Sequence, residues 1–274
     1  MFNERERPAL LVAALVTALV TVLVIGASGC ATPPEAPHAP TAVRVLSSNG
    51  VKSVVVVLQP DIERAIGHAL SIEFSTASSL KTKIETGQAF DVAILTPALV
   101  DDLIVQGKVA ADSRADFARA GVGVGVRQGA AVADVSTPDA LKSTLLKATS
   151  VVFTADGQSR STIDQAFERL GITEAMGPKT ILKGPGEGPD VVAAGEADLV
   201  LTLVSEILHV PGIQLLGPLP DDLQVYVSFT AGRGIDSTES EAADALLEYL
   251  SGPAMAAALD AHGLEPAGLH DTSR

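Results

Sequence analysis

Three short segments rich in serine and threonine are the part of this chain best suited to hold a ligand. They span residues 47–50, 75–78 and 157–162, and each lies between an apolar stretch and a stretch with helical periodicity. A helix N-terminus carries about half a positive charge and free N–H groups, so such segments favour a negatively charged ligand. The candidate ligand-binding residues are Ser47, Ser48, Asn49, Gly50, Ser75, Thr76, Ala77, Ser159, Arg160 and Ser161.

Two simpler interpretations of these residues stay open. Serine and threonine before a helix often do no more than cap it, by accepting a hydrogen bond from its first N–H groups. Arg160 is the only basic residue in the three segments. Its guanidinium could hold a carboxylate through two parallel hydrogen bonds, or it could be a solvated surface group.

Catalytic and metal-binding patterns are weak. The five histidines, at positions 38, 68, 209, 262 and 270, are scattered, and no pair has the spacing of a metal site. No serine lies in a nucleophile elbow, and no phosphate-loop lysine is present. Glu187 and Glu206 are the only candidates for a general base, and we interpret both as solvated. The sequence therefore predicts no catalytic residue, metal site or cofactor.

The elements that position the three segments alternate between strands and helices. Strands are expected at residues 43–46, 71–74, 91–95, 121–127, 150–153, 179–182, 197–203 and 224–229. Helices are expected at 51–66 (with a kink or break at Pro60), 79–86, 97–107, 137–147, 161–170, 189–194, 240–250 and 253–262. This order predicts an α/β fold with mostly parallel sheets. Ligands bind at the carboxyl ends of such strands, so the three segments are expected to face one cleft.

The N-terminal residues predict export. Arg5 and Arg7 precede an apolar run over residues 9–27, which is the layout of a secretory signal. Residues 27–30 resemble a bacterial lipoprotein box, and Cys30 is the only cysteine, so lipid attachment at Cys30 is its predicted role. The alternative is an uncleaved membrane-spanning helix, because the run approaches the roughly 20 residues that a bilayer requires.

A spacer and an acidic surface follow the predicted anchor. Residues 30–41 contain four prolines and read as an extended tether. The net charge of −14 argues against nucleic acid and anionic lipid headgroups as partners, since both require basic patches. We expect a monomer outside the cytoplasm, attached to a membrane through its lipid, with a small anionic ligand bound in a locally built site.

Residues 74–87 and 90–95 resemble the second ligand loop of periplasmic molybdate-binding proteins, and the likeness continues through 166–171, 195–198 and 249–253. The resemblance implies the type II solute-binding fold, in which two α/β lobes are joined by two crossing strands, here near 121–127 and 224–231. It divides the chain into a signal peptide (1–29), a spacer (30–41), lobe I (42–122 plus 228–266), lobe II (123–227) and a tail (267–274).

Three ligand positions differ from the molybdate pattern. Gly50 and Ala77 stand where that family has serines, and Leu203 stands where it has a tyrosine. Backbone N–H groups remain, and Ser48, Thr76 and Ser159 lie beside these positions. The resemblance therefore implies an anion site that is tuned to a ligand other than molybdate.

Two functions follow from this resemblance. The leading interpretation is a binding protein that closes its lobes on a small oxyanion or organic carboxylate and delivers it to an ABC-type permease. The alternative is an enzyme, because periplasmic aconitate isomerases resemble the same group. A cleft that holds a tricarboxylate needs only one well-placed proton carrier to become an isomerase.

Overall fold

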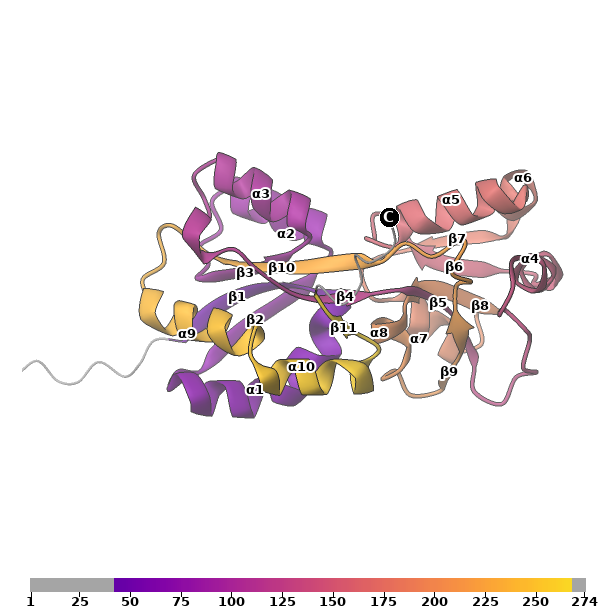
Figure 1. The fold of residues 1–274 in the computed structure, drawn as a ribbon. Coiled ribbons are helices and arrows are strands. Elements are labelled where there is room, and N and C mark those ends of the chain that lie inside the picture. Colours follow the sequence, from indigo (N-terminus) through magenta and orange to yellow (C-terminus); the bar gives the residue numbers. More distant parts are fainter. Residues whose placement is uncertain (1–41, 268–274) are drawn as a thin grey trace, which may run out of the picture. The chain divides into compact units, whose positions relative to one another are not determined.

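The chain folds around two β-sheets, which the computed structural model describes over residues 42–267. The first sheet has six strands in the order β11-β4-β10-β3-β1-β2, and the second has five in the order β7-β6-β8-β5-β9 (Figure 1). We call the part built on the six-stranded sheet lobe I and the part built on the five-stranded sheet lobe II. The predicted signal peptide, Cys30, the spacer, and all of the tail except its first residue lie outside the described residues.

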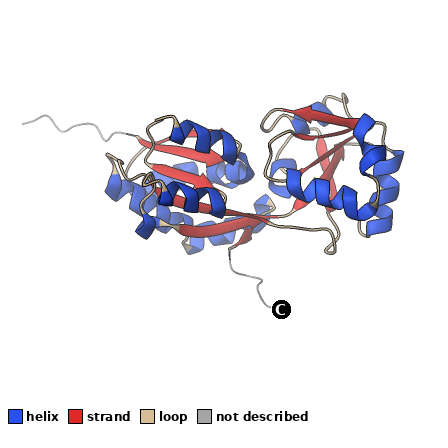
Figure 2. Ribbon diagram, turned by 90° about the horizontal axis from the view of Figure 1, so that it is seen from above, coloured by secondary structure: helices blue, strands red, loops and turns tan. Residues whose placement is uncertain are grey.

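Lobe I is built from strands whose two faces pack against different helices. Its strands are β1 (Val43–Ser48), β2 (Leu70–Ser75), β3 (Val92–Leu95), β4 (Ala115–Ala120), β10 (Val227–Arg233) and β11 (Glu265–Pro266). Successive side chains of a strand point to opposite faces. Val45 accordingly joins a core with residues of α1 (Lys52–Ile66) and α9 (Ser240–Leu250), whereas Leu46 joins one with residues of α2 (Ala77–Glu85) and α3 (Pro97–Val105). Figure 2 shows helices on both sides of these strands.

Lobe II follows the same plan. Its strands are β5 (Val122–Arg127), β6 (Val151–Thr154), β7 (Thr180–Lys183), β8 (Leu199–Leu203) and β9 (Ile213–Pro218). Its helices are α4 (Pro138–Lys147), α5 (Arg160–Leu170), α6 (Thr173–Met176), α7 (Gly188–Ala193) and α8 (Val204–Ile207). The chain then returns to lobe I, where α10 (Pro253–Leu259) and a 3₁₀ turn, η4 (Asp260–His262), follow α9 and precede β11.

The expected α/β class is confirmed, but the sheets are mixed rather than mostly parallel. β1 pairs with β2 and β3 in parallel, and β6 pairs with β7 and β8 in parallel. The strands by which the chain enters each lobe from the other run in the opposite direction: β10 is antiparallel to both β3 and β4, and β5 is antiparallel to both β8 and β9. A strand that returns to a lobe runs opposite to the strand by which the chain left it. The periodicity of helices and strands in the sequence does not predict this change of direction.

The two connections between the lobes are short and lie against each other. Gly121 joins β4 to β5, and residues 219–226 join β9 to β10. Gln224 was expected inside a strand, but β10 begins at Val227, and the Gln224 side chain instead pairs with the backbone of Val122. Its amide accepts from the Val122 N–H at 2.9 Å and donates to the Val122 carbonyl at 2.8 Å. One side chain thus replaces a missing strand partner where the chain crosses between lobes.

Helix α1 is continuous through Pro60, where a kink or break was expected. It runs from Lys52 to Ile66 and ends at Gly67, which adopts a left-handed conformation with φ 71°. Glycine favours this helix end because it has no Cβ to clash in that conformation. In residues 42–267, no helix is long and apolar enough to cross a bilayer.

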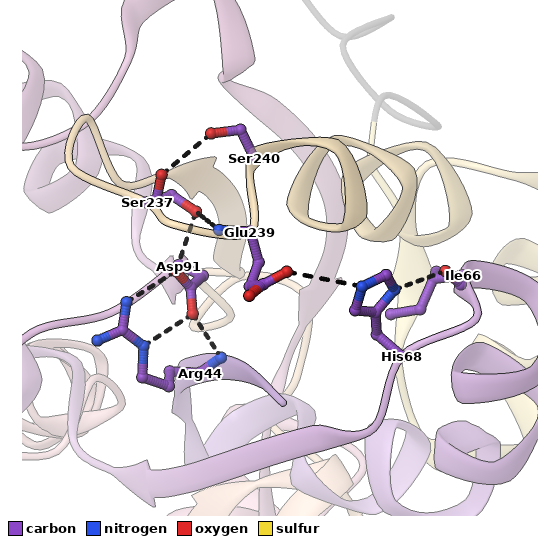
Figure 3. Close-up of polar contacts among 7 residues, drawn as sticks. All are labelled: Arg44, Ile66, His68, Asp91, Ser237, Glu239 and Ser240. Carbon is purple, nitrogen blue, oxygen red and sulfur yellow. Dashed lines mark hydrogen bonds and ion pairs between the residues drawn. The ribbon is translucent and has the colours of Figure 1, made fainter. Parts of the chain in front are cut away.

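A buried carboxylate, Asp91, lies just before β3 and binds Arg44 near the start of β1 (Figure 3). Ser48 and Ser75 lie at the opposite, carboxyl ends of β1 and β2. Asp91 is 0% exposed and accepts hydrogen bonds from the Arg44 backbone N–H at 2.8 Å, the Arg44 guanidinium at 2.8 and 2.9 Å, and the Ser237 hydroxyl at 2.9 Å. Burial alone would raise the pKa of Asp91, but these hydrogen bonds outweigh it and lower the pKa to about 2.

We expect Asp91→Asn to cost roughly 2 kcal/mol of folding free energy at pH 7, because the shift of the Asp91 pKa from 3.8 to about 2 is worth about 1.4 kcal/mol per unit. A lowered carboxyl pKa stabilises the fold above pH 4, and this stability is lost as the pH falls toward 2. Urea unfolding at pH 7 and pH 3 should show a smaller difference between the two proteins at pH 3. Asp101→Asn, which removes an exposed partner of Arg114, is the control and should cost less than about 1 kcal/mol. An Asp91→Asn variant as stable as the wild type at pH 7 would contradict this assignment.

Candidate functional site

A small polar cavity of about 20 Å³ lies where the carboxyl ends of strands from both lobes meet. Lobe I contributes Ser48 and Asn49 after β1, and Ser75 and Thr76 at the end of β2. Lobe II contributes the end of β6 and the loop before α5, the loop before α7, and the end of β8 with α8; these residues are Thr154, Gly157, Gln158, Ser159, Gly186, Thr202, Leu203 and Glu206. The volume is close to that of a single water molecule. A solute of several atoms therefore requires the two walls to separate.

Two lobe I hydroxyls in this cavity, those of Ser48 and Thr76, each make two hydrogen bonds. Ser48 accepts from the Gly50 N–H at 3.2 Å and donates to the Gln158 side-chain oxygen at 3.1 Å. Thr76 accepts from the Ser79 N–H at 3.3 Å and donates to the Asp156 carboxylate at 3.1 Å. The capping interpretation is thus correct for the acceptor role of both residues. Their single protons are directed across the cleft, to lobe II.

A third hydrogen bond crosses between the lobes behind the cavity. The buried Ser205 hydroxyl on α8 donates to the Gly50 carbonyl at 2.7 Å. Gly50 itself is buried, and an added Cβ there would meet the Phe229 ring and lie 2.7 Å from Leu203 Cδ1. Gly50 stands where the molybdate-binding pattern has a serine. In this structure, the space that such a side chain would enter is occupied by Phe229 of β10 and Leu203 of β8.

The structure brings five of the ten predicted ligand-binding residues to the cavity wall: Ser48, Asn49, Ser75, Thr76 and Ser159. Ser47 is fully buried in β1, and Ala77 is buried at the start of α2, in the core of lobe I. Gly50 is held by the contacts just described, and Ser161 is exposed on α5. For these four residues, contact with a ligand stays a prediction.

Arg160 does not line the cavity. Its guanidinium forms an ion pair with Asp164, one turn later in α5, at 2.8 Å, and lies 5.3 Å from the Phe153 ring centroid. Among the residues that line the cavity, no lysine or arginine is present. An anion in this part of the structure would therefore be held by hydroxyl, amide and backbone N–H donors.

Glu206, which the sequence led us to interpret as solvated, lines the cavity instead. Its carboxyl group is hydrogen-bonded to the Thr202 hydroxyl on the preceding strand. Burial raises the pKa of Glu206, and the hydrogen bond from Thr202 offsets that effect only in part. This carboxyl group is therefore protonated more readily than an exposed glutamate.

Gln158 adds a further polar group. Its side-chain oxygen is occupied by Ser48, while its side-chain nitrogen is buried and has no hydrogen-bond partner among the described residues. A buried amide donor without a partner costs about 1–3 kcal/mol. A ligand oxygen in the adjoining cavity would satisfy it.

The sequence could have indicated part of what it missed. Gln158 and Gly157 belong to the third segment, and only their neighbours were selected from it. Thr202 and Glu206 follow the same rule as the other segments, since they lie at the carboxyl end of a strand, and their spacing of four residues is that of one helical turn. The apolar residues Leu203 and Val204 lie between them, so the segment does not stand out in the sequence as rich in polar residues.

Comparisons with known proteins agree with the fold. The family described as bacterial extracellular solute-binding protein matches residues 43–265. Aconitate isomerase from a Pseudomonas species is 34% identical over 242 residues, which are 86% of this chain and 92% of that protein.

Solved structures share the fold at low identity. The periplasmic molybdate-binding protein of Azotobacter vinelandii superimposes with a TM-score of 0.68 at 15% identity, covering 81% of this chain and 98% of that one. The sulfate-binding protein of Mycobacterium tuberculosis gives a TM-score of 0.68 at 14% identity, covering 84% of this chain and 88% of that one. The expected resemblance and the two-lobed periplasmic binding protein fold are thereby confirmed.

Gly50→Ser tests how the site differs from the serine-bearing pattern. Because the added side chain would overlap Phe229 and Leu203, we expect a loss of about 1–3 kcal/mol of stability and no gained affinity for molybdate. Thermal unfolding with and without molybdate measures both effects. Gly177→Ser is the matched control, since an added Cβ there meets nothing within 4 Å. A stable Gly50→Ser protein that binds molybdate would contradict this account.

Proposed function

The chain belongs to the bacterial extracellular solute-binding protein family, and on that premise we propose that it captures a small anion, an organic carboxylate rather than molybdate, between its lobes. The observation that carries this proposal is the cavity itself. It lies at the carboxyl ends of strands from both lobes and is lined by hydroxyl and amide groups from each.

Lobe closure supplies the binding step. The contacts Ser48–Gln158 and Thr76–Asp156 join side chains of lobe I to side chains of lobe II across the cavity. A solute oxygen that enters the cleft can accept the protons that Ser48 and Thr76 give to these partners. Hinge closure around a ligand would then replace hydrogen bonds between the lobes by hydrogen bonds from the lobes to the ligand, with little net change in free energy.

The donor set favours a carboxylate over an inorganic oxyanion. A permanently double-charged anion gains most from fixed donors on all sides, whereas Gly50, Ala77 and Leu203 offer no side-chain donor. The carboxyl group of Glu206 would repel such an ion when ionised and could donate to a carboxylate when protonated. An organic acid also leaves the apolar Leu203 with a carbon atom to contact.

The family and the N-terminal sequence support a proposal for location and partners. We propose that the chain is exported, is anchored to the membrane through lipid on Cys30, and works as a monomer that passes its ligand to an ABC-type permease. The support for export is the predicted signal peptide at residues 1–29, in which Arg5 and Arg7 precede the apolar run at 9–27. Labelling of the full-length protein with a radioactive fatty acid, compared with Cys30→Ser, tests the anchor.

A thermal-shift panel on the purified full-length protein tests the ligand class. Mono-, di- and tricarboxylates, sulfate and molybdate are each added at increasing concentration. A ligand at 100 times its dissociation constant adds about 2.7 kcal/mol of stability, or roughly 5–10 °C for a protein of this size. We expect a shift with carboxylates and none with molybdate. A shift with molybdate alone would overturn the proposed ligand class.

Thr76→Ala should weaken the carboxylate-induced shift, because it removes a donor that lines the cavity. Thr82→Ala is its matched control, since Thr82 is exposed on the same helix and bonds only to backbone within it. Equal shifts in both variants would remove Thr76 from the site.

Isomerisation of a small tricarboxylate is a second candidate. Its support is the 34% identity to an aconitate isomerase, together with the placement of Glu206 in the cavity. A proton carrier must lie within about 3 Å of the proton that it moves, and Glu206 is the only carboxylic acid among the residues that line this cavity.

Glu206→Gln separates the two candidates. The amide keeps a hydrogen-bond donor but cannot exchange a proton, so we expect binding to be retained and any isomer formation to stop. Carboxylate affinity of the wild type should fall as the pH rises through the raised pKa of Glu206, and the variant should lose this dependence. Proton NMR of cis- or trans-aconitate incubated with each protein detects isomer formation. Glu174→Gln, at an exposed residue of α6 that does not line this cavity, is the control. If the wild type forms no isomer, the isomerase function is rejected. If the wild type binds carboxylates with an affinity that does not depend on pH, the role of Glu206 is contradicted.

A further inference from the structure

A larger hollow, which we call the outer groove, opens beside the polar cavity. It has a volume of about 630 Å³ and lies between α1 and the end of β2 on one side, and the loop before α7 and the end of α8 on the other. Its lobe I wall contains Val56, Val57 and Phe74, and its lobe II wall contains Pro185, Val210 and Pro211. Each lobe therefore contributes an apolar wall.

The outer groove adjoins the cavity. Asn49, Gly186 and Glu206 line both spaces. The cavity, at about 20 Å³, has room for little more than one polar group, whereas the groove falls in the range of small-molecule sites, about 300–1,000 Å³. A solute whose polar end enters the cavity has its remaining atoms directed past Glu206 into the groove.

Two of the valines that line the groove are exposed to solvent. Val56 is 47% exposed and Val57 is 61% exposed, on consecutive positions of α1. Scattered surface valines require no explanation, but these two face a concave space that an apolar wall from the other lobe completes. Closure on an apolar body would remove both walls from water at once.

The charges around the groove favour a solute with one anionic end. Lys52 is its only lysine or arginine and lies 5.7 Å from the Phe74 ring centroid, while Glu187 and Asp190 place two carboxylates on the opposite wall. A second anionic group on the solute would meet more negative than positive charge there. The net charge of −14 also opposes the binding of a solute with more than one anionic group.

We propose that the outer groove is a subsite for an apolar carbon body, so that the chain selects monoanionic organic acids with an alkyl or aryl body attached to the carboxylate. The carboxylate occupies the cavity with the donors of Ser48, Thr76 and Gln158, and the body lies between Phe74 and the Val210-Pro211 wall. The inference rests on the proposed solute-binding function and names its substrate class.

Calorimetric titration of the full-length protein with acetate, butyrate, hexanoate and benzoate tests the subsite, with sulfate and trans-aconitate as comparison ligands. Each buried methylene contributes about 0.8 kcal/mol, so affinity should rise about fourfold per methylene from acetate to hexanoate. Hexanoate and benzoate should bind more tightly than sulfate and trans-aconitate.

Val57→Asn supplies the matched variant, because it introduces no charge and replaces a residue that is already exposed. We expect it to weaken hexanoate binding several-fold and to leave acetate binding unchanged. Val105→Asn, at a residue of α3 that is 86% exposed and does not line the groove, should change neither.

The outcomes separate this inference from the function on which it rests. Acetate and hexanoate binding with equal affinity, or trans-aconitate binding more tightly than hexanoate, would overturn the apolar subsite and leave the solute-binding function standing. Failure of every acid and oxyanion to bind would overturn both. Equal losses in Val57→Asn and Val105→Asn would remove α1 from the subsite.

Discussion

The cleft depends on how two hydroxyl protons are used. Ser48 and Thr76 each accept a hydrogen bond from the first turn of the helix that follows, and each donates its one proton to lobe II. A hydroxyl has a single proton to give, so the partner across the cleft and an incoming solute compete for it. The acceptor role holds each side chain in place whichever of them receives the proton. The same residue can therefore serve as a helix cap, a lobe contact and a ligand donor, and these roles are not alternatives.

Stability and binding are placed at opposite ends of the same strands. Arg44 and Ser48 belong to one strand, and the first forms the ion pair with the buried Asp91 while the second lines the cavity. The charged cluster at the amino ends fixes β1, β3 and the segment before α9 relative to one another, without placing a cation near the ligand. The carboxyl ends are thus left free to carry short polar side chains, whose directions are set by the strands beneath them.

The regular part of this arrangement was readable from the sequence, and the non-local part was not. Elements with clear periodicity, such as α9 at residues 240–250, lie where the sequence places them. The strand β4 was missed, because charged residues interrupt its apolar alternation and only pairing with β10 and β11 makes it a strand. Within the site, Ser48 and Thr76 are predicted by the rule that ligands bind at the carboxyl ends of strands. Gln158 and Glu206 are identified as site residues only when lobe II is placed against lobe I. The packing of Phe229 against Gly50 joins residues 179 positions apart, which no local pattern encodes.

The electrostatics of the cleft connect these observations to ligand choice. The chain is acidic, its cavity wall has no lysine or arginine among the lining residues, and Arg160 pairs with Asp164 instead. A site of this kind cannot rely on net charge to attract an anion and must use short-range hydrogen bonds and contact with carbon. Short-range donors discriminate by shape, and apolar walls discriminate by size. A site with both hydrogen-bond donors and apolar walls discriminates among acids by their carbon body as well as by their charge. A site built only for a tetrahedral oxyanion lacks the apolar walls for this discrimination.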